Sequence, residues 1–385
     1  MQGVDAGAGA GSRFHHEVAA LELEWANDDR WKDTRRDYTA EDVVRLRGPV
    51  SIEYTLARLG AERFGERLRA GPPIRAACAR TDAQALRIVR AGLDALYVSR
   101  RNVADRPIHA GQARPDRSLG PGDSAPALVR HINNAILRTD HGEWSEGDAR
   151  RSSLVPIVAD AEAGPGGPLH AFERMKAMIE AGAAAVHFED QIAVDTMPGR
   201  SGGKVLVPTP HFIRVLNAAR LAADALGVPA YIIARTNAFF ANPITSTADE
   251  SGREDLTGER TRDGHVRACA GVDAAIRRAI AYAPYADLLW FGTPSPDLDQ
   301  ARRFAEAIRT RFPGKHLAYD GSLFLSGRWS LDPQTIARLQ NELGAMGYRF
   351  QVITPAGWRS ADLHTFEPAH RYRHEEVPAP ALPGD

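Results

Sequence analysis

The sequence has few cysteines, no long apolar stretch and almost no excess of charge of either sign. Its 385 residues include two cysteines, Cys78 and Cys269. Two are too few for the disulfide framework of a secreted domain, so a reducing, cytoplasmic location is the simpler interpretation. No apolar run approaches the roughly 18 residues of a membrane helix, so no membrane span is expected. The 48 Lys and Arg nearly cancel the 49 Asp and Glu, which gives no indication of a nucleic-acid partner.

The two ends of the chain have the composition of tails. Residues 1–14 are small and polar and lack the basic start and apolar centre of a signal peptide, so we expect a disordered leader. Residues 366–385 include a Pro-rich stretch, and we expect a C-terminal tail there. Helical patterns predict an N-terminal extension over 15–72, packed on a main domain over 73–365.

The main domain alternates short apolar runs with longer segments of helical period. The apolar runs are at 74–79, 94–99, 154–160, 184–190, 230–236, 286–292, 316–321 and 348–354. Between them, apolar residues recur three and four positions apart, as on a helix that lies against a sheet. Strands separated by helices pair in parallel, and eight such strands close a barrel. No GxGxxG turn follows an early strand, which disfavours an open doubly wound sheet. We therefore predict an α/β protein, a (β/α)8 TIM-type barrel with an N-terminal helical extension.

Polar residues end most of these runs, and in such a barrel the chemistry lies at the C-terminal ends of the strands. They are Ser99, Asp160 with Glu162, Glu189 with Asp190, Arg235 with Thr236 and Asn237, Asp320 with Ser322, and Thr354. A single residue of this kind often does no more than cap the next helix. Carboxylates at the ends of two adjacent strands, with an arginine on the next, favour a binding site instead.

Crowded carboxylates repel one another unless a cation lies among them, and ligation by oxygen alone suits Mg²⁺ or Mn²⁺. An arginine close by suits the carboxylate of a substrate. The residues by themselves therefore indicate a metal-dependent enzyme that acts on a small oxo- or hydroxy-carboxylic acid.

The same segments resemble the isocitrate lyase family, part of the isocitrate lyase and phosphoenolpyruvate mutase superfamily. The matching motifs follow one another in order along the chain. They are PIVADAEAG (156–164), KAMIEAGAAAVHFEDQ (176–191), GGKVLVPT (202–209), ARTNA (234–238), TGERT (257–261), AYAPYADLLW (281–290) and TPAG (354–357). The resemblance extends over residues 20–365, and it implies the same barrel fold.

The resemblance also implies a site with one metal ion and a substrate in two parts. It implies Mg²⁺ bound directly by Asp160, with the waters of the metal held by Asp116, Glu162 and Glu189. The implied substrate contacts are Tyr97, Ser99 and Arg235 on a glyoxylate half, and Ser322 and Thr354 on the other half. The family cleaves a carbon–carbon bond; the metal polarises the carbonyl being formed, and the carbanion released must be protonated.

The departures from the family pattern are concentrated in the part that handles succinate. The family loop KKCGH carries the cysteine that protonates the leaving carbanion, but Pro198 stands at the cysteine position and Arg200 at the histidine position. The family stretch NCSPSFNW binds the carboxylates of succinate, but residues 320–327 read DGSLFLSG, and only Ser322 keeps its hydroxyl. Gly292 replaces a glutamate of the family.

Other residues have weaker functional claims. Cys78 and Cys269 are interpreted as small buried hydrophobic residues that do not replace the missing thiol. His187, within a strand run, is interpreted as a structural histidine, and Asn237 stands where the family has aspartate. Arg200 is either a solvated loop residue or binds an anionic substituent of the substrate.

Three hypotheses follow for the function. The first is a Mg²⁺-dependent or Mn²⁺-dependent lyase with altered specificity, with Arg235, Arg200 and Glu189 in catalytic roles. The second is an inactive family member that serves as a binding or regulatory subunit. The third is residual cleavage of isocitrate or methylisocitrate. The family also implies a homo-oligomer, dimer or tetramer.

Overall fold

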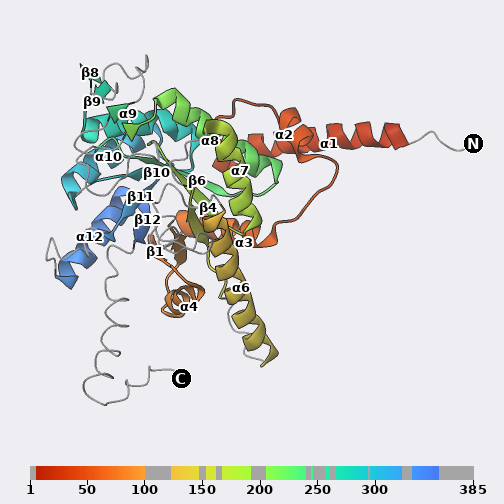
Figure 1. The fold of residues 1–385 in the computed structure, drawn as a ribbon, viewed down its shortest axis with the longest axis horizontal. Helices are drawn as coiled ribbons and strands as arrows, with labels where there is room; N and C mark the ends of the chain where they lie inside the picture. Colours follow the sequence, from red (N-terminus) through yellow and green to blue (C-terminus); the bar gives the residue numbers. More distant parts are fainter. Residues whose placement is uncertain are drawn as a thin grey trace, which may run out of the picture.

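The computed structural model describes residues 6–99, 123–146, 153–161, 167–191, 205–239, 244–245, 256–260, 266–293, 295–322 and 332–354. Eight strands, all paired in parallel, close into a barrel in the order β1-β12-β11-β10-β6-β4-β3-β2 (Figure 1). The strands are β1 (Ile74–Cys78), β2 (Ala95–Val98), β3 (Ile157–Asp160), β4 (Ala185–Glu189), β6 (Tyr231–Thr236), β10 (Leu288–Phe291), β11 (His316–Asp320) and β12 (Tyr348–Ile353). Each predicted apolar run forms one of them, so the predicted barrel is confirmed.

Helices follow the strands and surround the barrel. They are α4 (Asp82–Arg90), α6 (Ser124–Ser145), α7 (Gly167–Glu180), α8 (Thr209–Ala225), α9 (Val272–Tyr282), α10 (Leu298–Arg311) and α12 (Pro333–Met346), with a 3-10 turn η5 (Ala283–Tyr285). Side chains at the N-caps start three of them: Thr81, Asp297 and Asp332 each accept a hydrogen bond from a backbone amide of the first turn. Gly347 ends α12 with φ of 103°, a left-handed conformation that favours glycine.

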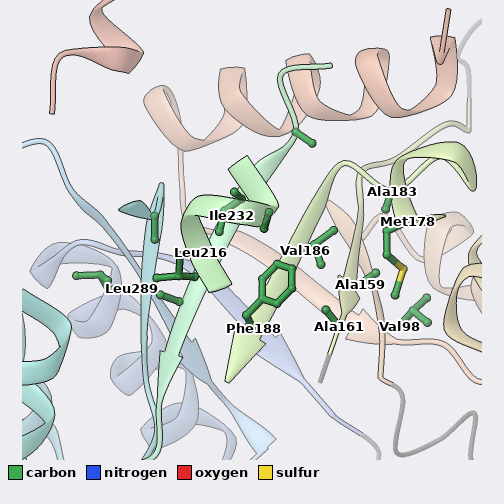
Figure 2. Packing of buried hydrophobic residues seen from close by; sticks show 14 of the residues in the cluster. Val98, Ala159, Ala161, Met178, Ala183, Val186, Phe188, Leu216, Ile232 and Leu289 are labelled. Carbon is green, nitrogen blue, oxygen red and sulfur yellow. The ribbon is translucent and has the colours of Figure 1, made fainter. Parts of the chain in front are cut away.

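Alternate side chains of each barrel strand point outward and pack against the helices. Figure 2 shows this outer layer where α7 and α8 cover the strands. Its labelled residues include Val98, Ala159, Val186, Phe188 and Ile232 on the strands, with Met178 on α7 and Leu216 on α8. They belong to one continuous cluster of buried apolar residues that joins the sheet to its helices.

The other side chains of each strand point into the barrel and form a separate apolar cluster. It includes Ile233, Trp290, Ala318, Phe350 and Val352. Because the side chains of a strand alternate between its two faces, residues two positions beyond these continue the interior toward the C-terminal ends. At that end the interior becomes polar, as the site described below shows.

The helix α3 (Thr55–Arg69) closes the opposite end of the barrel. Its Phe64 is fully buried and packs edge-on against Tyr231 at 5.2 Å and Phe350 at 5.7 Å between ring centroids. Gly65 faces the hydroxyl of Tyr231 so closely that any Cβ would clash with it. Burying one phenylalanine contributes roughly 1.5–3 kcal/mol to the free energy of unfolding. Phe64 therefore helps to hold α3 on the barrel.

The remaining N-terminal elements are α1 (Ala6–Asn27), η1 (Asp29–Trp31) and α2 (Ala40–Arg47). Helix α1 extends away from the barrel (Figure 1) and begins at Ala6. The sequence predicted a disordered leader over residues 1–14. In the structure, α1 includes residues 6–14. Arg30 of η1 donates hydrogen bonds to the carbonyls of Pro229 and Ala230 and to Asp287, which ties this part to the barrel.

A small second sheet has the order β5-β7-β9-β8. Its strands are β5 (Val205–Leu206), β7 (Ile244–Thr245), β8 (Leu256–Arg260) and β9 (Val266–Ala268), and the sequence patterns did not predict them. Cys78 is buried as expected, but Cys269 is only partly buried, so that expectation is wrong for it. The predicted tail over 366–385 lies outside the described residues. In the part of the chain that is described, no helix is both long and apolar enough to cross a membrane.

Candidate active site

The polar end of the barrel interior includes residues of three neighbouring strands. Asp160 ends β3, Glu189 ends β4, and Arg235 lies near the end of β6, each on the inner face. The register pairs Asp160 with His187 and Glu189 with Arg235 across adjacent strands. Strand pairing alone therefore brings two carboxylates, an imidazole and a guanidinium together.

Asp160, His187 and Glu189 form a cluster whose ligand atoms all lie within 4.8 Å of one another. The Nε2 atom of His187 lies 3.4 Å from Oδ1 of Asp160. Asp160 is buried and His187 is completely so. Two carboxylates held this close repel each other, and a divalent cation between them would remove that repulsion.

Glu189 is fixed by two groups from β6 and the turn after it. The Nη1 atom of Arg235 lies 3.3 Å from Oε1 of Glu189, and Asn237 donates from Nδ2 to Oε2 at 2.9 Å. Burial disfavours the charge of Arg235, but the carboxylates of Glu189, Asp320 and Asp160 outweigh it, and the pKa of Arg235 is raised. The guanidinium therefore stays charged at the mouth of the barrel.

Asp190 leaves β4 on the outer face, opposite to Glu189, and anchors the same turn from behind. It accepts hydrogen bonds from the hydroxyl of Thr236 and the backbone amide of Asn237, both at 2.8 Å. Arg278 and Tyr282 of α9 contact its Oδ2 at 3.5 Å and 3.3 Å. This buried network sets the position of Asn237 and, through it, of Glu189.

Aromatic side chains form the floor beneath the cluster. The Tyr97 hydroxyl lies 2.6 Å from Nε2 of His187, and the planes of the two rings are 3° apart. Trp290 packs edge-on against His187, with ring centroids 5.0 Å apart, and the guanidinium of Arg235 lies 4.9 Å from the indole centroid. Burial, followed by the charge of Asp160, raises the pKa of Tyr97 well above its usual value, so the phenol keeps its proton.

The donor set of the cluster fits a hard divalent cation. Carboxylate oxygens of Asp160 and Glu189 are the ligands that Mg²⁺ and Mn²⁺ prefer, and an imidazole is compatible with Mn²⁺. His187 shares its Nε2 with the Tyr97 hydroxyl, so it is well placed to orient Asp160.

On the far side of the barrel, Ser322 and Thr354 form a hydrogen-bonded pair. Their hydroxyl oxygens lie 2.8 Å apart, and the backbone amide of Thr354 donates to Oγ of Ser322 at 2.6 Å. Ser322 is buried just beyond the end of β11, and its amide donates to Oδ1 of Asp320 at 3.0 Å.

A small cavity lies beside the cluster, between α7 and α8. Its volume of about 30 Å³ is close to that of one water molecule. It touches Glu189, His170 and His211, and burial lowers the pKa of His211. This cavity is too small for the substrate that the mouth of the barrel suggests.

The structure brings together Asp160, Glu189, Arg235 and Tyr97 in one cluster, and it places Ser322 with Thr354 opposite. Ser99 is buried and directly follows the last residue of β2, two positions after Tyr97. The predicted residues Asp116, Glu162 and Arg200 lie outside the described residues, so their roles stay predictions.

His187 and Trp290 border the cluster but were not predicted as members of the site. His187 was interpreted as a structural histidine, and its hydrogen bond to Tyr97 agrees with that; the same nitrogen also lies 3.4 Å from Oδ1 of Asp160. The available signal was the alternation along the strands: His187 precedes Glu189 by two positions, and Trp290 pairs with Arg235 in register.

Comparison with known proteins identifies the family of this chain. A sequence model of the isocitrate lyase family matches residues 17–259 and 254–381. Isocitrate lyase of Halalkalibacterium halodurans is 48% identical over 368 residues, covering 96% of this chain and 86% of that protein. Isocitrate lyase of Escherichia coli is 49% identical over 368 residues, covering 94% and 85%. The chain belongs to the isocitrate lyase family.

Solved structures share the fold at lower identity. Oxaloacetate acetylhydrolase with 3,3-difluorooxalacetate has a TM-score of 0.59 at 20% identity, covering 84% of this chain and 89% of that one. A 2,3-dimethylmalate lyase has a TM-score of 0.57 at 21% identity, covering 85% and 87%. These likenesses confirm the architecture of the barrel.

Proposed function

We propose that the protein is a Mg²⁺-dependent or Mn²⁺-dependent lyase that cleaves or forms a carbon–carbon bond of a small oxo- or hydroxy-carboxylic acid, with a specificity different from isocitrate. The observation that carries the proposal is the cluster of Asp160 and Glu189 beside Arg235. Carboxylates whose oxygens lie within 4.8 Å of each other repel, and a bound divalent cation would offset that repulsion.

The residues of the site have separate roles in binding the metal and the oxo-acid. Asp160 would hold the metal directly, and Glu189, with Asp116 and Glu162, would hold its waters. A metal bound there would supply Lewis-acid polarisation of the carbonyl that forms as the bond breaks. Arg235 binds the carboxylate of the oxo-acid half, because a guanidinium matches two carboxylate oxygens in one plane. Tyr97 and Ser99 complete this half of the pocket.

The other half of the reaction lacks the family thiol, since Pro198 has no titratable atom. We assign to Arg200 the electrostatic stabilisation of negative charge on the leaving fragment. A fragment that delocalises its charge as an enolate needs no thiol and is protonated by water. Ser322 and Thr354 contact this fragment.

Two other functions have support. Ordinary isocitrate lyase activity is favoured by the 48% and 49% identity to proteins of that name. A binding or regulatory role as an inactive subunit is favoured by Pro198 and by the changed stretch at 320–327. Assembly into a homo-oligomer and a cytoplasmic location belong to the same proposal.

The deciding experiment incubates the protein and Mg²⁺ with isocitrate, methylisocitrate and a panel of hydroxy- and oxo-acids, and identifies products by mass spectrometry. Cleavage of a panel member with little turnover of isocitrate supports the proposal. Turnover of isocitrate near that of an ordinary enzyme, on the order of 10 s⁻¹, supports the isocitrate lyase alternative. Mg²⁺ binding by the protein without any turnover supports the inactive subunit.

A further inference from the structure

Asp320 lies diametrically across the barrel from the candidate metal site. In the closed order of strands, β11 is four strands from β3 in both directions. Asp320 ends β11 as Asp160 ends β3. Anything bound between the two halves of the mouth therefore meets Asp160 at one end and the end of β11 at the other.

The side chain of Asp320 points into the barrel. Leu317 and Tyr319 belong to the outer cluster that faces the helices, whereas Ala318 belongs to the inner cluster. Asp320 continues the inner face, and its partner in register, Val352, is also an inner residue. The carboxylate is thus on the wall of the mouth.

Asp320 keeps acceptor capacity for a ligand. Among the described residues its carboxylate accepts a hydrogen bond from the amide of Ser322 at 3.0 Å, and a carboxylate has about four lone-pair positions in all. It is partly exposed. The hydroxyls of Ser322 and Thr354 stand next to it and complete a polar wall.

The charge of Asp320 reaches across the mouth. Burial lowers the pKa of Arg235, but the carboxylates of Glu189 and Asp320 raise it, so the charge of Asp320 acts on this guanidinium. Arg235 is already paired with Glu189 at 3.3 Å, so no cation of the described residues neutralises Asp320 by direct contact. A second carboxylate placed here would meet an anion.

We propose that Asp320 selects the distal end of the substrate, and that this end carries a hydrogen-bond donor, such as a hydroxyl or an amide, in place of a second carboxylate. The inference rests on the proposed function and narrows its substrate class. The substrate is an oxo- or hydroxy-acid with one carboxylate, which faces Arg235, and a donor group, which faces Asp320, Ser322 and Thr354.

The test compares a dicarboxylate with its monoamide. Succinate and succinamate are titrated into the protein by calorimetry with Mg²⁺ and glyoxylate present. Because a like charge opposes binding and an amide donates to Asp320, wild type should bind succinamate at least about tenfold tighter than succinate. The isosteric variant Asp320→Asn should bind both within about threefold of each other. Asp320→Ala serves the same purpose if the first variant does not fold.

A matched control is Asp299→Asn, which removes one charge from an exposed side chain on α10. It should keep the wild-type preference. The inference is overturned if Asp320→Asn and wild type have the same preference, if wild type favours succinate, or if neither compound binds to either protein. It is also overturned if Asp320→Asn weakens the binding of glyoxylate as much as it changes the binding of succinate or succinamate. Asp320 would then act through Arg235.

Failure of the proposed function has a separate signature. If Mg²⁺ does not bind to wild type in calorimetry without any acid, the lyase proposal fails and the inference fails with it. If Mg²⁺ and glyoxylate bind but the preference for the amide is absent, only the assignment of Asp320 fails.

Discussion

The hydroxyl of Tyr97 lies 2.6 Å from Nε2 of His187, and the planes of the two rings are 3° apart. The same nitrogen lies 3.4 Å from Oδ1 of Asp160. The hydrogen bond with Tyr97 and the edge-on contact with Trp290 therefore hold the imidazole that borders the candidate metal ligand. Groups behind a metal ligand commonly tune the affinity of the site.

The variant Tyr97→Phe keeps the aromatic ring and removes the hydrogen bond to His187. We expect a loss of about 1–3 kcal/mol in the free energy of unfolding, since a buried polar atom loses its partner, and a weakening of Mg²⁺ binding by about tenfold. Urea denaturation and calorimetry measure the two effects. The matched control is Tyr348→Phe, which removes another buried tyrosine hydroxyl, bonded to the carbonyl of Ala301. If both variants bind Mg²⁺ like wild type, His187 does not support the metal site.

The variant Asp160→Asn tests the metal ligand itself. It preserves the shape of the side chain and removes the charge that a hard cation requires. We expect Mg²⁺ affinity to fall more than the 10–100-fold that loss of a supporting residue costs. Calorimetry with Mg²⁺ and Mn²⁺ measures this, with Asp299→Asn as the control for a lost charge. Equal binding by wild type and Asp160→Asn would remove Asp160 from the site.

The fold was predictable because the barrel strands are short, mostly apolar runs that are largely buried. Such runs, separated by helical segments, leave few arrangements other than a barrel. The ends of the runs also indicated Asp160, Glu189 and Arg235, and the structure brings them together. Ser322 and Thr354 were similarly found to be in contact.

Other features of the site and fold could not be predicted from the apolar runs alone. His187 and Trp290 stand inside apolar runs, and only the register across strands shows that they face the cluster. Asp190 looked equivalent to Glu189, but it leaves β4 on the outer face and joins α9. Helix α1 starts at Ala6, although its small residues carry little helical pattern. Contacts between segments far apart in the sequence decide which way these side chains face and where such a helix starts.

Pro198→Cys should not restore isocitrate lyase activity. A positioned acid contributes about 10²–10⁴-fold, but the family stretch that binds succinate is also changed at 320–327, and Asp320 adds a negative charge there. A glyoxylate-release assay on wild type and Pro198→Cys measures this. A gain in isocitrate turnover of 10²-fold or more would mean that the thiol alone was missing, and that the specificity is that of isocitrate lyase.

Stability should fall between about pH 6.5 and about pH 4 because of His316, whose pKa is lowered to about 4 by burial and by the charges of Arg349 and Lys315. In that range the unfolded chain binds a proton at this histidine and the folded chain does not, so acid favours unfolding. One group contributes at most about 1.4 kcal/mol per pH unit. In urea denaturation, the free energy of unfolding of His316→Asn should depend less on pH than that of wild type. The control His131→Asn, at an exposed position, should show the same pH dependence as wild type. Parallel curves for all three would contradict this role.

The last prediction concerns Asn237, whose Nδ2 donates to Oε2 of Glu189 at 2.9 Å. In Asn237→Asp the donor becomes a second carboxylate at the same place, and two charges about 4 Å apart repel by roughly 4 kcal/mol near a protein surface. Arg235 offsets part of this, so we expect the metal-free variant to melt several degrees below wild type. A cation bound at Asp160 and Glu189 would neutralise the new charge as well, and binding to the folded state alone raises stability. Saturating Mg²⁺ should therefore raise the melting temperature of Asn237→Asp more than that of wild type. The control Asn341→Asp makes the same change on the exposed side of α12 and should respond to Mg²⁺ like wild type. If Mg²⁺ raises the melting temperature of all three proteins equally, the cation does not lie near Glu189. A cation bound there would interact with the new carboxylate at position 237 and stabilise that variant more.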